Sequence, residues 1–192
     1  MRTFTTIFLL TASLAAPAMA DGALQKLITP QDQQRLDDYD KTRTAALAEA
    51  RNGGTSEDLA TLDAALSGQA LSFGDGFDMT GTWRCRTIKL GGAVPLVVYG
   101  WFTCRVSDDG AGWRLEKVSG SQRTTGRFYT VSDTRLVYLG AMHTSLEPAM
   151  AYGTQAERNQ LGIVERPATN RLRIEFPKPA FESSLDILDM QR

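Results

Sequence analysis

The sequence has 192 residues, with 21 Lys and Arg, 22 Asp and Glu, and a net charge of −1 at pH 7. This near balance offers no basic surface, so neither nucleic acid nor an anionic membrane is expected as a partner. The length suits one ordinary domain that buries its own hydrophobic core.

Residues 1–20 have the three parts of a secretory signal peptide. Arg2 supplies the positive charge, an apolar run follows it, and Ala18-Met19-Ala20 forms a small-residue cleavage site. The apolar run is shorter than the ~20 residues that a membrane-spanning helix needs, and no later segment qualifies as a span. We therefore expect cleavage after Ala20 and a protein that works in the periplasm or outside the cell.

Cys85 and Cys104 are the only cysteines in the sequence. In an oxidising compartment such a pair is expected to form a disulfide, whereas in the cytosol the two cysteines would be expected to stay as free thiols. A redox-active pair is the alternative, but such pairs are usually spaced C-x-x-C beside a helix start. Export therefore favours a structural disulfide.

Residues 21–72 are predicted to form a helical hairpin. Thr29, followed by proline, is typical of a helix start, and this helix is expected to end at the glycines 53–54. A second start at Thr55, with acids in its first turn, leads to a helix that ends before Gly68. Both helices have thin apolar stripes, so we expect them to pack on the segment that follows.

Residues 80–192 are predicted to form an antiparallel β-domain, an eight-stranded lipocalin-like barrel or sandwich, so the fold class is mainly β. No helix of crossover length separates the β-rich runs, which excludes a parallel α/β sheet. The expected strands are 81–89, 96–107, 112–118, 122–131, 134–142, 161–166, 171–176 and 181–190. Gly81-Thr82-Trp83 resembles the G-x-W start of lipocalin-type barrels, in which the tryptophan closes the barrel floor.

The expected disulfide separates the two faces of the first hairpin. If both cysteines point the same way, period-2 alternation defines a core face and an opposite face. The core face comprises Trp83, Cys85, Leu96, Val98, Phe102, Cys104 and Val106. The opposite face comprises Arg84, Arg86, Val97, Tyr99, Trp101 and Arg105.

Four residues of the opposite face, Arg84, Arg86, Trp101 and Arg105, form the first candidate ligand-binding site. Guanidinium groups bind carboxylates and phosphates through paired hydrogen bonds, and they stack on aromatic rings. The alternative is structural and is the commoner arrangement. In it, the aromatic rings lie under the N-terminal helices, and the arginines pair with acids on those helices.

The polar run 119–126 contains the second group of candidates, Ser121, Gln122 and Arg123. A buried strand does not tolerate polar side chains on both faces unless they find partners. The run therefore predicts either an edge strand blunted by polar residues, which is the commoner case, or the lining of a polar cavity in a barrel.

The sequence contains no recognisable catalytic or metal-binding set. His143 is the only histidine and no G-x-S-x-G motif occurs, which disfavours a Ser-His-Asp site. Zinc needs more His or Cys, and residues 74–78 lack the spacing of a calcium loop. No catalytic residue, metal or cofactor is assigned. A hydrolase built on His143, or on Glu147 with Glu157 or Glu165, is the third hypothesis.

A family resemblance is carried by the blocks 81–92, 99–105, 120–124 with 126–127, 136–141, 171–177 and 181–183. Together they resemble a family of exported proteobacterial proteins known as domain of unknown function 4893. The resemblance implies export and a domain that covers residues 80–192, and it supplies no activity, ligand or functional residue.

These features lead to two further hypotheses about function. The first is a monomeric, non-enzymatic module that binds a small or anionic ligand. The alternative is an interaction module of the cell envelope, similar in outline to small periplasmic protease inhibitors. Its protein partner would contact the helical segment or the long 143–160 loop.

Overall fold

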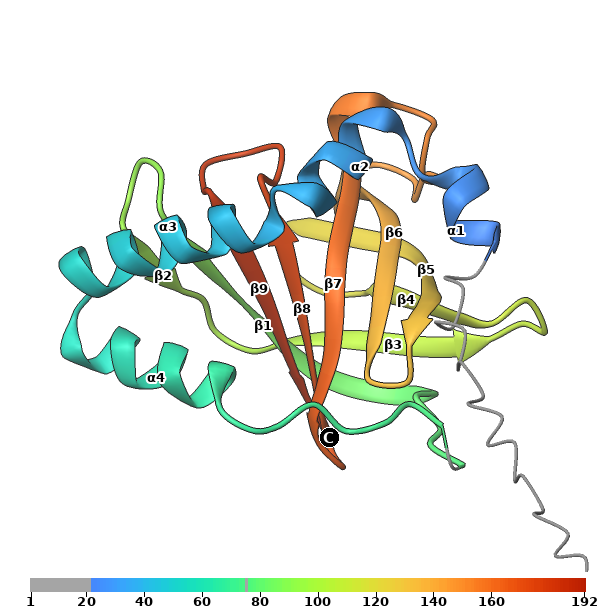
Figure 1. Ribbon diagram of the computed structural model, residues 1–192, viewed down its shortest axis with the longest axis horizontal. Helices are drawn as coiled ribbons and strands as arrows, with labels where there is room; N and C mark the ends of the chain where they lie inside the picture. Colours follow the sequence, from blue (N-terminus) through green and yellow to red (C-terminus); the bar gives the residue numbers. More distant parts are fainter. Residues whose placement is uncertain (1–21, 75) are drawn as a thin grey trace, which may run out of the picture.

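Figure 1 shows the computed structural model, which describes residues 22–74 and 76–192. The expected signal peptide and its cleavage site lie outside the described residues. The helices are α1 (Gly22–Leu27), α2 (Pro30–Asp37), α3 (Tyr39–Gly53), α4 (Ser56–Leu66) and the short η1 (Ala156–Arg158). The strands are β1 (Gly81–Leu90), β2 (Leu96–Val98), β3 (Phe102–Asp108), β4 (Trp113–Lys117), β5 (Gln122–Ser132), β6 (Arg135–Thr144), β7 (Asn159–Ala168), β8 (Arg171–Pro177) and β9 (Leu185–Gln191).

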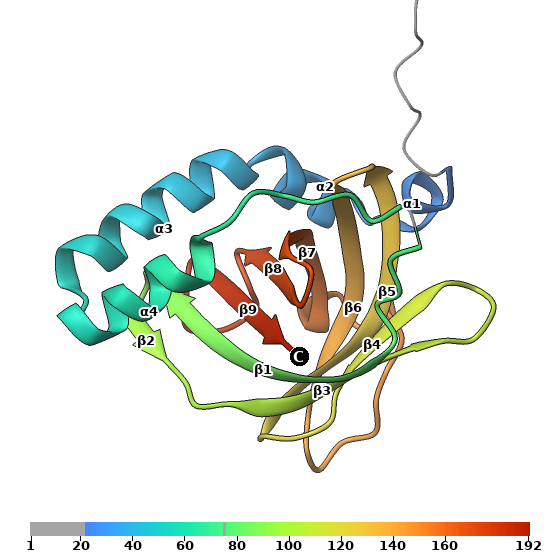
Figure 2. The same cartoon turned by 90° about the horizontal axis from the view of Figure 1, so that it is seen from below.

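The strands form one antiparallel sheet that closes on itself, which confirms the predicted fold class. The sheet order is β2-β1-β3-β4-β5-β6-β7-β8-β9, and β1 also pairs with β9. Eight strands therefore make a barrel, and β2 is an extra strand beside β1. Figure 2 looks along this barrel and shows α3 and α4 against one side of the ring. Closure leaves few free strand edges.

The predicted strand 96–107 is two strands in the structure. The chain pairs with β1 as β2, breaks at residues 99–101, and pairs with β1 again as β3. Leu96 and Val98 pack with the helices outside the barrel, whereas Phe102 packs on the interior core. Placing these three residues on one face was therefore wrong, because period-2 alternation does not continue across an irregular segment.

The N-terminal helices also differ from a simple hairpin. The helix expected to run from residue 30 to the glycines at 53–54 is divided at Asp38, which ends α2 and precedes α3. Both predicted starts are confirmed, since the hydroxyls of Thr29 and Thr55 each accept a backbone N–H three residues later, at 3.2 Å.

Two apolar clusters attach the helices to the outside of the barrel, as their thin apolar stripes required. The first joins α3 and α4 to β1, β2 and β9 through Ala46, Ala50, Leu62, Ala65, Ile88, Leu90, Leu96, Leu185 and Ile187. The second joins α1 and α3 to β6 and β7 through Leu24, Tyr39, Val137, Leu139, Leu161 and Ile163. The division into a helical segment 21–72 and a β-domain 80–192 stays a prediction.

Buried charges fix the helices to β8. The guanidinium of Arg173 donates to the carbonyl oxygen of Leu66 at the end of α4, at 3.0 Å. Glu175 accepts hydrogen bonds from the hydroxyl of Tyr39 at 2.9 Å and from Arg43 at 2.8 Å. A cation at a helix C-terminus satisfies carbonyl groups that have no partner within the helix. The helical layer is therefore held by specific polar contacts as well as by apolar packing.

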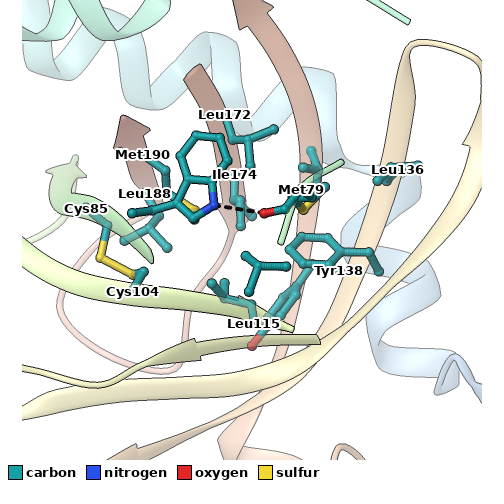
Figure 3. Packing of buried hydrophobic residues seen from close by; sticks show 14 of the residues in the cluster. Met79, Cys85, Cys104, Leu115, Leu136, Tyr138, Leu172, Ile174, Leu188 and Met190 are labelled. Carbon is teal, nitrogen blue, oxygen red and sulfur yellow. Dashed lines mark hydrogen bonds between the residues drawn. A yellow bond between two sulfur atoms is a disulfide. The ribbon is translucent and has the colours of Figure 1, made fainter. Parts of the chain in front are cut away.

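The barrel interior is filled with apolar side chains at the end where β1 begins (Figure 3). Trp83 is fully buried there, and its indole N–H donates to the carbonyl of Met79 at 2.9 Å. Arg192 lies 4.3 Å from the centre of the Trp83 ring. Cys85 and Cys104 form the predicted disulfide in the same core. Trp83 thus closes one end of the barrel, as the G-x-W resemblance implies.

Candidate functional site

On four of the eight barrel strands, the inward-facing residues change from apolar to polar along the barrel axis. Starting from the packed end, they are Trp83, Cys85, Thr87 and Lys89 on β1, Leu115 and Lys117 on β4, Phe128, Gly126, Thr124 and Gln122 on β5, and Met190, Leu188 and Asp186 on β9. The register brings the polar members together, since Lys89 is the direct cross-strand partner of Asp186. We call this region, opposite the end closed by Trp83, the polar end.

Two hollows lie between side chains of the polar end. One of about 120 Å³ is lined by residues that include Lys89, Phe102, Lys117 and Gln122. A smaller one of about 50 Å³ shares Lys117 and Gln122 and adds Asp186. Their size is below that of pockets for drug-sized molecules, so the polar end has room for a ligand of a few heavy atoms.

Lys117 faces both hollows. It is only 7 % exposed, and its ammonium donates to the backbone carbonyl of Gln122 at 2.7 Å. Within residues 22–74 and 76–192, no carboxylate forms an ion pair with it. Burial, together with the nearby cations Arg123 and Lys89, lowers the pKa of Lys117 to about 8.

Lys89 and Asp186 complete the charged lining. The ammonium of Lys89 lies 2.8 Å from the carboxylate of Glu182. The backbone of Glu182 has a φ of 70°, in the left-handed region that is unusual for a residue other than glycine. Ser183 donates its hydroxyl hydrogen to Asp186 at 2.5 Å, and burial raises the pKa of Asp186 to about 6. Among the described residues, Lys89 therefore has a carboxylate partner and Lys117 has none. With Arg123, three cations and two carboxylates line the hollows, which leaves the polar end with excess positive charge.

The three candidates of the polar run lie beside this lining. Ser121 and Gln122 line the larger hollow, and Arg123 lines the smaller one. The predicted edge strand is wrong, because β5 lies between β4 and β6 in the closed sheet. The alternative, a polar cavity lining, agrees with their place beside the two hollows, and the ligand-binding role of the three residues stays a prediction.

The other candidates lie on the outside of the barrel. The ring centre of Trp101 is 4.3 Å from the guanidinium carbon of Arg84 and 4.5 Å from that of Arg86. Among the described residues, the acid that pairs with Arg86 is Asp189 of β9, at 3.1 Å, and not an acid of the helices. Arg105 is exposed on β3. The predicted ligand-binding role of these residues stays a prediction.

His143 and the candidate carboxylates do not line the hollows of the polar end. The ring nitrogens of His143 lie 3.4 Å from the Thr125 hydroxyl and 3.0 Å from the Thr144 carbonyl. Glu147 and Glu165 are each ion-paired with arginine. The described ranges, 22–74 and 76–192, contain no cluster of three or more His, Cys, Asp or Glu suited to a metal.

Comparison with known protein families gives a match. Residues 24–190 match the domain of unknown function DUF4893. The chain belongs to this family. No curated protein and no solved structure matches it. The match to DUF4893 includes the helices as well as the barrel, whereas the blocks that carry the resemblance in the sequence begin at residue 81. In the part of this DUF4893 chain that the structure describes, no helix has the length and apolar character to cross a bilayer.

Sequence reasoning missed Lys89, Lys117 and Asp186 in this DUF4893 chain. A signal for Lys89 was present, because continuing the alternation from Trp83 and Cys85 places it on the core face. A lysine is unusual on a strand face whose first residues belong to the core. It indicates either that the lysine has a buried charge partner or that it belongs to a binding site. Asp186 was harder to place, since its strand begins at Leu185 rather than at residue 181 as predicted.

Proposed function

We propose that this chain is a non-enzymatic binding module that holds a small anionic ligand at the polar end of its barrel. The observation that carries the proposal is Lys117, a buried ammonium that faces two hollows without a carboxylate partner among the described residues. An isolated buried charge is unfavourable, and a ligand anion would supply the missing partner through charge-assisted hydrogen bonds.

The polar end also contains groups that suit a hydrogen-bonding ligand. The side-chain oxygen of Gln160 is buried without a hydrogen-bond partner, and Gln160 lines the smaller hollow. Such an oxygen favours a ligand that brings a hydroxyl or amino hydrogen. Thr87 lines both hollows and adds a hydroxyl group. A small hydroxy acid combines the required anion and donor in a few heavy atoms.

Calorimetric titration with sodium lactate at constant ionic strength tests this proposal. The variant Lys117→Met removes the buried charge, and Lys41→Met removes an exposed lysine of α3 as a matched control. We expect saturable binding to the parent and to Lys41→Met, and binding at least about tenfold weaker to Lys117→Met, since a hydrogen bond to a charged group contributes ~1.5–3 kcal/mol. Equal binding to all three proteins, or no binding to the parent, would overturn it.

We also propose that the protein works after export, in an oxidising compartment. The Cys85–Cys104 disulfide supports this, because such bonds persist mainly in secreted and periplasmic proteins. Intact-mass analysis of protein isolated from the cell envelope is expected to show a chain that begins after Ala20. Full-length protein in the cytosol with two alkylatable thiols would contradict it.

One observation favours the alternative of an interaction module. Leu146, in the loop after β6, is 95 % exposed, and a groove of about 300 Å³ next to this loop is lined by Leu27, Leu139 and Met150, among others. Exposed apolar side chains beside a groove are typical of protein contact sites. Pull-down from envelope extract should then recover a partner with the parent but not with Leu146→Ser. Recovery of no partner by either protein would count against this alternative.

A further inference from the structure

We propose that the ligand of the polar end is a small oxo acid, and that the Lys117 amine binds its carbonyl carbon reversibly as an imine. This inference rests on the proposed function, because it assigns a ligand class and a bonding mode to the same site.

The position of Lys117 distinguishes it from the other lysine of the polar end. Lys117 lines both hollows, and its ammonium is held by a backbone carbonyl and an aromatic ring. Lys89 lines only the larger of the two, and its ammonium is occupied by Glu182 at 2.8 Å. An amine that must attack a carbonyl carbon cannot be engaged by a carboxylate at the same time, so Lys117 is the nucleophile of this pair.

The surroundings of Lys117 favour its neutral, nucleophilic form. Burial and the cations Arg123 and Lys89 both disfavour the charged ammonium. With a pKa of about 8, roughly a tenth of the amine is unprotonated at pH 7, against fewer than about one in a thousand for an ordinary lysine. Desolvation and neighbouring cations are the two means by which proteins activate lysine for imine formation.

The same cations suit the acid group of the ligand. Arg123 lines the smaller hollow, and Lys89 lines the larger one. A carboxylate next to a carbonyl carbon could lie against either cation while the carbonyl faces Lys117. The volume of about 120 Å³ restricts the ligand to a short chain such as a two- or three-carbon oxo acid.

The reaction needs proton transfer but no oxidant or reductant. The lone pair of the Lys117 Nζ forms a bond to the carbonyl carbon, and the carbonyl π electrons move to the oxygen, which takes a proton. A second proton lets this oxygen leave as water, while the nitrogen loses both of its protons and the carbon–nitrogen double bond forms. One amine and one carbonyl compound thus give one imine and one water.

The proton transfers are assigned to Asp186. It lines the smaller hollow together with Lys117. Burial raises the pKa of Asp186 to about 6, so both its acid and its carboxylate form are populated near neutral pH. A carboxyl group in this range can give a proton to the carbonyl oxygen and accept one from the nitrogen.

Reductive trapping with a matched pair of ligands tests the inference. Pyruvate has the carbonyl, and lactate has the same size and charge without it. We expect pyruvate with borohydride to give one adduct per chain, mapped by peptide mass spectrometry to Lys117, in the parent and in Lys41→Met. Lys117→Arg, which keeps the charge, should form no adduct and still bind lactate. Thermal melting confirms that each variant is folded.

The outcomes separate this inference from the proposed function. Lactate binding without any pyruvate adduct at Lys117 overturns the imine and leaves the anion site standing. Binding of neither ligand overturns both. Adducts spread over several surface lysines, or an unchanged adduct in Lys117→Arg, would also overturn the imine, because they show that the trapped amine is not Lys117.

Discussion

The ammonium of Lys117 lies 4.2 Å from the centre of the Phe102 ring, at the boundary between the packed core and the polar end of the barrel. Such a contact stabilises a buried cation by ~2 kcal/mol. Removal of an ammonium from water costs several kcal/mol, so the ring offsets only part of the penalty. The lowered pKa of Lys117, about 8, reflects the remainder. A lysine retained at such a cost to stability is typical of a functional position.

Replacing Lys117 with methionine should therefore stabilise the unliganded protein. The pKa in the folded chain is about 8 against 10.5 for an ordinary lysine, which corresponds to up to ~3 kcal/mol at pH 7. Because the folded-state pKa is the lower one, this penalty is complete below about pH 8 and disappears as the pH rises toward 10.5. Urea unfolding at pH 7 and pH 10 measures the difference.

The parent should become more stable relative to Lys117→Met between these two pH values. Lys41→Met, on the exposed surface of α3, should match the parent within ~0.5 kcal/mol. If Lys117→Met is the less stable protein at pH 7, the lysine is a structural element of the β4–β5 turn and not a site residue.

Replacing Asp186 with asparagine should change how the free energy of unfolding depends on pH below neutrality. The pKa of Asp186 is raised by burial to about 6 from 3.8, so the folded chain binds a proton that the unfolded chain releases between these values. Parental stability should then fall as the pH rises from about 4 to about 6, by up to ~3 kcal/mol from this group. The asparagine variant should lack this decline, which urea titrations at pH 4.5 and 7 would show.

The decline in stability between about pH 4 and about pH 6 must be absent from Asp186→Asn. It must be present in the control Asp133→Asn, because Asp133 is exposed in the parent. Lys89 and Glu182 also face Asp186, so their own pKa values should be followed by NMR in the same series. Parallel profiles for parent and Asp186→Asn would show that its carboxyl is not desolvated.

Removing the disulfide should destabilise the barrel. Both cysteines are fully buried, and the bond closes a loop of about 20 residues, for which the chain-entropy model gives ~3 kcal/mol. The double variant Cys85→Ala, Cys104→Ala should lose about this much in urea unfolding, and a reductant should lower the midpoint of the parent in the same way. A reductant without effect, with both thiols reactive toward an alkylating agent in the folded state, would contradict the assignment.

The helical layer should depend on Arg173. This side chain is 7 % exposed and binds the carboxylate of Glu165 at 2.6 Å as well as the end of α4. Arg173→Met leaves Glu165 with Arg135 as its remaining ion-pair partner and removes the donor to the carbonyl oxygen of Leu66, which together cost ~1–3 kcal/mol. Amide hydrogen exchange should show early loss of protection in α4, whereas Arg105→Met, on an exposed position, should leave α4 protected. Equal protection in both variants would show that apolar packing alone holds the helix.

The fold was predictable where local pattern decides it. Turn residues and β-rich runs identified the strands, and Thr29 and Thr55 identified two helix starts correctly. The break at residues 99–101 was not predictable, because it depends on how β2 and β3 each pair with β1. It was this break that placed Leu96 under the helices instead of in the interior.

The candidate site was predictable only in part, because it forms where distant strands meet. Ser121, Gln122 and Arg123 were found as an unusually polar run in one strand. Lys89 and Asp186 are nearly a hundred residues apart and become neighbours only when β1 pairs with β9 to close the barrel. The residue pattern within one strand does not show which strand it pairs with, so the grouping of charges at the polar end was not predictable from the sequence.

The most direct test of the anion site is the pKa of Lys117 itself, measured by NMR of the side-chain amine with and without sodium lactate at constant ionic strength. An anion that binds beside Lys117 stabilises its charged form, so the pKa should rise from about 8 as the site saturates. A Lys117 pKa that does not respond to lactate, or that responds equally to sodium chloride, would contradict the proposed site.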